Sequence, residues 1–207
     1  MIPLFKHTKE NYKVCVYQLL NDDANQINFN ECVKAYFMCC DVRFAQPVES
    51  FNELESGEII IFDMKNLTFK HLTRIVLSTL RMFFKYLQDA HPVKIIQLHV
   101  INCTPVVNKA MMLIKPLMYS KLYNTLKFHN AGSYDSLYEV VPREILPSDF
   151  GGDGQSMADM KTHWLSVLNG YRDFLMNDDY FRLHDTDTKN YNKERQKVGG
   201  IFSFLTS

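Results

Sequence analysis

Two apolar stretches decide the fold, Glu58-Ile-Ile-Ile-Phe-Asp63 and Val93-Lys-Ile-Ile-Gln-Leu-His-Val-Ile101. Both are short and rich in β-branched residues, a pattern typical of strands that are buried on both faces of a sheet. Between them, apolar residues recur at helical spacing from Leu72 to Leu87, and His91-Pro92 ends the pattern. A strand, a helix and a second strand in this order predict a βαβ unit with parallel strands.

The rest of the chain continues the alternation. Lys13–Leu20 is predicted as a strand, and Asn28 has the position of a helix N-cap before the apolar face that includes Phe29 and Cys40. Further elements are expected as a helix over 106–122, a strand over 125–129 and a helix over 157–175. The fold class is therefore α/β, with a mainly parallel sheet covered by helices.

Composition narrows the class of protein. The 207 residues suit one domain with a tail, which we place at 1–176 and 177–207. The 23 basic and 23 acidic residues give a net charge of zero, which disfavours bulk attraction to nucleic acid. The five cysteines are odd in number and form no C-x-x-C pair, so we expect a cytoplasmic protein without disulfides.

No motif supports catalysis. The glycine-rich stretch Gly151-Gly-Asp-Gly154 lacks the spacing of a phosphate loop, and the histidines never fall at metal-ligand spacing. Asp63 at a strand end and His99 within a strand are conceivable catalytic groups, but a loop-anchoring carboxylate and a core histidine are the favoured interpretations. We therefore predict no enzyme, no cofactor and no metal.

Four short motifs occur in the order and spacing of CRAL-TRIO lipid-binding domains. They are Ile61-Phe-Asp63, His91-Pro-Val-Lys94 leading into Leu98-His-Val-Ile-Asn102, Ile114-Lys-Pro116, and Leu146-Pro with Phe150-Gly-Gly152. Over residues 2–176 the chain most resembles the α-tocopherol transfer protein and cellular retinaldehyde-binding protein branch, and its tail resembles extensions of insect members. The resemblance implies an apolar cavity on the sheet, a mobile gate helix, and transfer of a lipophilic molecule between membranes. The family's N-terminal three-helix module is absent, so a short form or a fragment is expected.

The resemblance also implies a set of site residues. Tyr36 and Cys40 align with two serines near the polar end of the ligand in the tocopherol-binding member, which puts tocopherol itself in doubt. The expected ligand wall comprises Val33, Tyr36, Phe37, Cys40, Phe62, Tyr86, Leu87, Val93, Ile95 and Leu98, and the expected gate residues are Val107, Ala110, Leu113 and Leu117. Residues at such spacing are also those of an ordinary core, and that alternative stays open.

Recognition of a phosphoinositide head group is expected to be weak. Lys94 and Lys121 match the basic cluster of the tocopherol protein, whereas Ile96 and Thr125 stand where it has arginines. Loss of an arginine removes a bidentate phosphate contact. Two other functions stay open, namely an interaction or regulatory module that has lost lipid transfer, and an enzyme acting through Asp63 and His99.

Overall fold

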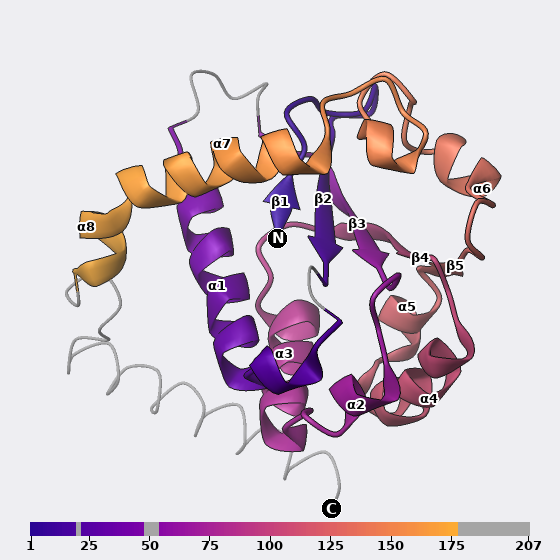
Figure 1. Cartoon of the computed structure of the whole chain (residues 1–207). Coiled ribbons are helices and arrows are strands. Elements are labelled where there is room, and N and C mark those ends of the chain that lie inside the picture. Colours follow the sequence, from indigo (N-terminus) through magenta and orange to yellow (C-terminus); the bar gives the residue numbers. More distant parts are fainter. Residues whose placement is uncertain (20–21, 48–53, 178–207) are drawn as a thin grey trace, which may run out of the picture. The chain divides into compact units, whose positions relative to one another are not determined.

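The computed structural model describes residues 1–19, 22–47 and 54–177, and its centre is a five-stranded sheet (Figure 1). The strands are β1 (Ile2–Pro3), β2 (Tyr12–Gln18), β3 (Gly57–Asp63), β4 (Ile95–Ile101) and β5 (Leu126–Phe128), and they lie side by side in that order. All neighbouring strands pair in parallel except β1 and β2, which are antiparallel. The predicted α/β class with a mainly parallel sheet is confirmed. The two-residue strand β1 escaped prediction because it is too short to show a period.

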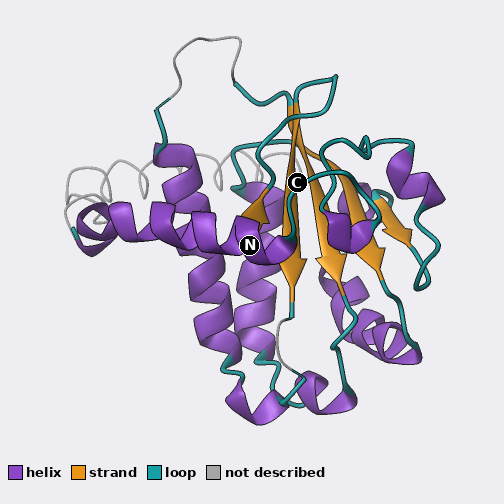
Figure 2. Cartoon of the chain, turned by 45° about the horizontal axis from the view of Figure 1, so that its top comes forward, coloured by secondary structure: helices purple, strands orange, loops and turns teal. Residues whose placement is uncertain are grey.

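Helices cover both faces of the sheet (Figure 2). On one face, α1 (Phe29–Ala45) and α3 (Leu77–Asp89) pack side by side, and α4 (Pro105–Ile114) follows β4. The opposite face is covered by the segment that contains α6 (Asp135–Tyr138), the 3-10 turn η4 (Ser148–Phe150) and α7 (Met157–Gly170). None of the helices in the described ranges combines the length and the apolarity needed to cross a membrane.

Strand alternation divides the apolar side chains between two clusters. Val16 and Ile61 are paired across β2 and β3 and belong to the cluster under α7. Their neighbours Tyr17 and Phe62 are also paired, and they belong to the cluster under α1 and α3. Because successive side chains of a strand point to opposite faces, this register decides which residues can line a cavity beneath α1 and α3.

The helix expected from Leu72 to Leu87 is in fact two helices. A short helix, α2 (Phe69–Leu72), ends before Thr73, and α3 begins only at Leu77 after an extended Val76. Thr68 and His71 form a reciprocal capping box at the start of α2. The β-branched residues Thr73, Ile75 and Val76 then disfavour continuation of the helix.

The helix expected over 106–122 is also interrupted. It divides into α4, the 3-10 turn η3 (Lys115–Leu117) and α5 (Ser120–Tyr123). Pro116 accounts for the break, because proline has no N–H to donate and its ring clashes with the carbonyl four residues earlier. The motif Ile114-Lys-Pro116 therefore marks the end of α4.

Glycines explain a second motif. A Cβ on Gly152 would lie 2.2 Å from the carbonyl oxygen of Leu146, so only glycine lets the chain pass that carbonyl. Gly151 has a φ of 73°, in the left-handed region. The stretch after Leu146 is thus a tight turn, as the sequence predicts.

The chain divides into two compact units, Met1–Asn169 and Gly170–Ser207. The helix expected over 157–175 ends at Gly170, and a separate helix, α8 (Arg172–Met176), follows it. Glycine lowers helix stability, which fits a break at this position. The expected tail from 177 lies, after its first residue, outside the described residues.

Candidate functional site: an apolar cavity beneath α1, α3 and α4

A cavity of about 270 Å³ lies between the sheet and the helices α1, α3 and α4. Its wall contains no charged side chain, and its only side-chain oxygens are two tyrosine hydroxyls. The lining residues are Tyr17, Phe29, Cys32, Val33, Tyr36, Phe62, Met64, Leu67, Leu80, Phe83, Phe84, Leu87, Leu98, Val100, Val107, Ala110, Met111, Ile114, Met118 and Leu126. Such a wall suits an apolar molecule.

The structure brings about half of the sequence-predicted site residues to this cavity. From the expected ligand wall, the lining residues are Val33, Tyr36, Phe62, Leu87 and Leu98. From the expected gate, Val107 and Ala110 line it, and both are buried.

Three other predicted wall residues belong to the same apolar cluster without lining the cavity. The rings of Phe37 and Tyr86 lie 4.9 Å apart, and each contacts the ring of Tyr36 edge to face. Cys40 lies one helical turn after Tyr36 and is 1% exposed. These three side chains therefore pack around Tyr36 and do not line the cavity. Helical spacing alone does not distinguish residues of these two kinds.

The remaining predicted residues lie elsewhere. Val93 and Ile95 line a second pocket, of about 340 Å³, together with all four positions of the expected basic cluster: Lys94, Ile96, Lys121 and Thr125. Leu113 is exposed on α4, and Leu117 lies in η3, where Pro116 has ended the helix.

Sequence reasoning missed several lining residues, of which Tyr17 is the most informative. Tyr17 pairs with Phe62 across β2 and β3, and their rings lie 5.0 Å apart. The sequence does contain a pattern that could have identified Tyr17, because any strand parallel to β3 places every second side chain on the face of Phe62. The register between the strands, which sequence alone does not supply, was the missing information.

The hydroxyls of Tyr17 and Tyr36 are buried; within the described part of the chain that of Tyr17 has no hydrogen-bond partner, whereas that of Tyr36 donates to the sulfur of Cys40. Burial raises the pKa of both phenols well above the usual value, and the charge of Glu58 raises both further. Both groups therefore stay protonated.

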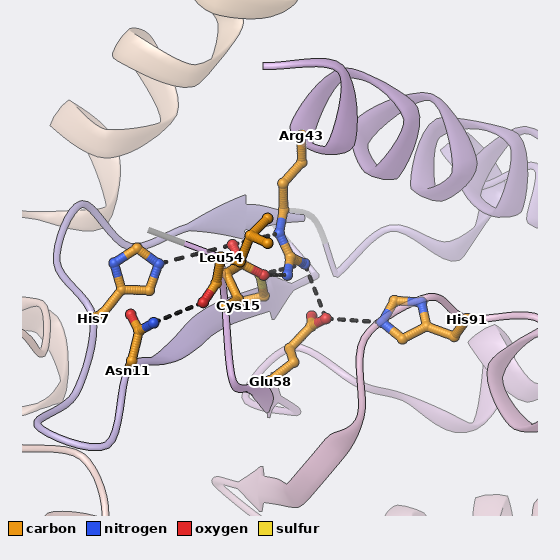
Figure 3. A network of polar contacts seen from close by, with 8 residues as sticks. His7, Asn11, Cys15, Arg43, Leu54, Glu58 and His91 are labelled. Atoms are coloured by element: carbon orange, nitrogen blue, oxygen red, sulfur yellow. Dashed lines mark hydrogen bonds and ion pairs between the residues drawn. The ribbon is translucent and has the colours of Figure 1, made fainter. Parts of the chain in front are cut away.

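A buried ion network closes the end of this face at the start of β3 (Figure 3). Arg43 of α1 lies 2.9 Å from Glu58, pairs with Glu55, and approaches the Cys15 sulfur at 3.4 Å. His91 contacts the same oxygen of Glu58 at 2.9 Å. Burial alone would raise the pKa of Glu58, but the contacts with His91 and Arg43 lower it. Glu58 is thus held as a carboxylate and ties α1 to the segment before β4.

Asp63 and His99 lie on the opposite face from the cavity. His99 is paired with Ile61, contacts His129 at 2.9 Å and Gln97 at 2.8 Å, and is fully buried. Asp63 accepts hydrogen bonds from Gln18, Asn102 and the backbone of Lys65. Neither lines the cavity, so the structure gives no support to catalysis by this pair at that site.

Comparison with known proteins places this geometry in a family. A profile described as the CRAL/TRIO domain matches residues 1–152. Clavesin-1 of Rattus norvegicus is 28% identical over 140 residues, which cover 68% of this chain and 38% of clavesin-1. Clavesin-2 of Homo sapiens is 26% identical over 140 residues, which cover 68% of this chain and 41% of clavesin-2. The chain thus spans about two-fifths of the length of these curated relatives.

A solved structure, described as the crystal structure of Sfh5, matches with a TM-score of 0.50 at 12% sequence identity. The match covers 77% of this chain and 57% of that chain. At this identity the likeness concerns the fold alone.

Proposed function

Because the chain belongs to the CRAL/TRIO domain family, we propose that it is a non-enzymatic, cytoplasmic carrier that binds one hydrophobic small molecule and transfers it between membranes. The observation that carries the proposal is the cavity of about 270 Å³, whose lining residues include no charged side chain. Burying about 300 Å² of apolar ligand surface would contribute about 7 kcal/mol before entropic costs.

The helix α4 is proposed as the gate. Val107, Ala110 and Met111 line the cavity from one side of the helix, while Met112 and Leu113 are exposed on another. A helix that is apolar both inside and outside can leave the cavity and meet a bilayer. Outward movement of α4 would open the cavity at the membrane surface.

The ligand is proposed from the class that includes tocopherols, retinoids and carotenoids. Tyr36 and Cys40, which take the place of two serines, are proposed to lie near its polar end, with Cys40 acting through Tyr36. Membership of the tocopherol and retinaldehyde branch, and an insect source, stay predictions.

A second candidate function is an interaction or regulatory module with weak contact to a phosphorylated head group. The pocket that contains Lys94 and Lys121 favours it, because both lysines are exposed and line the same pocket. Ile96 and Thr125 line the same pocket and supply no charge. The contact is therefore proposed as an aid to membrane docking.

The test combines lipid identification with a transfer assay. Lipids extracted from the purified protein are identified by mass spectrometry, and transfer of retinol and α-tocopherol is followed from donor to acceptor vesicles. Met112→Glu together with Leu113→Glu should slow transfer several-fold and leave equilibrium affinity unchanged, whereas Thr162→Glu together with Ser166→Glu, on the exposed side of α7, should change neither. Absence of any extracted lipid together with absence of transfer would contradict the proposal.

A further inference from the structure

Two methionine side chains separate the cavity from the outer surface of α4. An open surface pocket of about 560 Å³ lies on this outer side, and its lining residues are Asn108, Met111, Met112, Lys115, Pro116 and Met118. Met111 and Met118 also line the cavity, and they are the two residues that both linings contain. Both side chains are half-buried. Two thioethers therefore close the cavity wall at this point.

The thioether is the group in this wall that a peroxide can modify. Its sulfur attacks one oxygen of hydrogen peroxide and the O–O bond breaks. The departing hydroxide takes the proton of the transferred oxygen, so that methionine sulfoxide and water are formed. The sulfur is oxidised by two electrons and the peroxide is reduced. The reaction converts a flexible apolar side chain into one whose oxygen accepts hydrogen bonds.

The two sides of the wall would receive a sulfoxide differently. The accessible wall of the cavity is almost wholly apolar, so a sulfoxide that faces it is buried without a partner, which is unfavourable. The surface pocket contains the side chains of Asn108 and Lys115, both of which are exposed and can donate hydrogen bonds. Oxidation of Met111 and Met118 therefore favours an outward orientation of their side chains.

The other methionines do not combine these two properties. Of the ten in the chain, Met111 and Met118 alone line both the cavity and the surface pocket. Met112 is 69% exposed and lines the surface pocket, but it does not line the cavity. Met64 lines the cavity and not the surface pocket. Access for a peroxide and an effect on the cavity thus coincide at two residues.

We propose that Met111 and Met118 are a peroxide-sensitive modification site, at which oxidation to sulfoxides turns the two side chains out of the cavity wall and weakens binding of the lipophile. This redox switch is reversible, because methionine sulfoxide reductases restore the thioether. The inference rests on the proposed carrier function and adds a regulation to it.

The test compares binding of the neutral fluorophore N-phenyl-1-naphthylamine before and after treatment with hydrogen peroxide. Dithiothreitol is added after the peroxide, because Cys32 is exposed and also lines the cavity. Peptide mass spectrometry locates the oxidised methionines. Met111→Leu together with Met118→Leu removes the switch and keeps the wall apolar. Met82→Leu together with Met112→Leu is the matched control, because both residues are more exposed and neither lines the cavity.

We expect oxidation to weaken binding of the fluorophore by about fivefold or more, the effect of one buried polar group without a partner. The Met111→Leu, Met118→Leu variant should keep its affinity, whereas the Met82→Leu, Met112→Leu variant should lose as much as the unchanged protein. Treatment with the two methionine sulfoxide reductases, one for each epimer, should restore the affinity. The circular dichroism spectrum should not change.

The outcomes separate the two proposals. If the fluorophore binds and oxidation of Met111 and Met118 leaves its affinity unchanged, the switch is overturned and the carrier function stands. The switch is also overturned if these two residues are oxidised no faster than the buried Met157 and Met160, or if the Met111→Leu, Met118→Leu variant loses affinity equally. If the untreated protein neither binds the fluorophore nor transfers any lipid between vesicles, the carrier function fails and the switch fails with it.

Discussion

The phenol rings of Tyr17 and Tyr36 are stacked with centroids 5.5 Å apart; among the residues that the structure describes, the Tyr17 hydroxyl has no hydrogen-bond partner, and the Tyr36 hydroxyl donates to the sulfur of Cys40. The two residues come from a strand and from a helix that covers it, so the pair forms only when the fold is complete. The buried Tyr17 hydroxyl, which has no partner within the described residues, lowers the stability of the folded protein.

Removal of the Tyr17 hydroxyl should therefore stabilise the delipidated protein. We expect Tyr17→Phe to raise the free energy of unfolding by about 1 kcal/mol, because it removes an unpaired buried donor and keeps the ring contacts, whereas Tyr36→Phe loses a hydrogen bond to Cys40 and should bring no such gain. Urea unfolding followed by circular dichroism measures the change, with Tyr12→Phe as the control. A loss of stability of similar size in Tyr17→Phe would show that its hydroxyl has a partner in solution.

The buried network should respond strongly to loss of its cation. Arg43→Met leaves Glu58 and Glu55 without their guanidinium partner, and breaking a buried pair in this way costs about 3–5 kcal/mol. Arg81→Met removes an exposed arginine from α3 and should change stability by less than about 0.5 kcal/mol. Equal effects of the two substitutions in urea unfolding would refute the structural role of the network.

Acidification should destabilise the fold through His99. Burial, together with the neighbouring His129 and Lys127, lowers the pKa of His99 from the usual value of 6.5 to about 4. The unfolded chain therefore binds the proton first, so stability falls as pH drops from about 6.5 to 4, by up to about 3 kcal/mol.

Urea unfolding at several pH values between 7.5 and 4.5 measures this slope. His99→Gln should flatten it, whereas the exposed His163→Gln should preserve it. A slope that His99→Gln does not change would assign the pH dependence to other groups.

One added arginine should strengthen contact with phosphorylated head groups. Thr125 lines the pocket of Lys94 and Lys121, so Thr125→Arg supplies a bidentate phosphate donor there. We expect binding to vesicles containing phosphatidylinositol 4,5-bisphosphate to tighten about fivefold, with the gain reduced by salt. Thr162→Arg adds the same charge on the exposed side of α7, and an equal gain there would show that the pocket has no part in it.

The sequence predicted the parallel strands well, because buried β-branched runs such as Ile59–Ile61 leave little alternative. Helix boundaries were harder. The apolar spacing passes through Ile75 and Val76 without a sign that α2 ends at Leu72 and that α3 begins only at Leu77. Pro116 was visible in the sequence, and its breaking effect on the helix over 106–122 was underestimated.

Only part of the site could be predicted from the sequence, again because local patterns do not show how the elements pack together. Helical and strand spacing identify an apolar face, but they do not separate residues that line a cavity from those that pack behind it. Tyr36 and Phe37 are adjacent on α1, and only Tyr36 lines the cavity. Arg43 and Glu58 lie fifteen positions apart, and their pairing depends on how α1 crosses β3, which no local pattern encodes.

The most direct test of the account is ligand occupancy measured by native mass spectrometry after a side chain is placed inside the cavity. Ala110 is buried in the cavity wall on α4, whereas Ala158 is exposed on α7, so Ala110→Phe and Ala158→Phe form a matched pair. The account predicts that Ala158→Phe retains the bound lipophile and that Ala110→Phe loses it while keeping its circular dichroism spectrum. Full occupancy in a folded Ala110→Phe variant would contradict the claim that this cavity is the binding site.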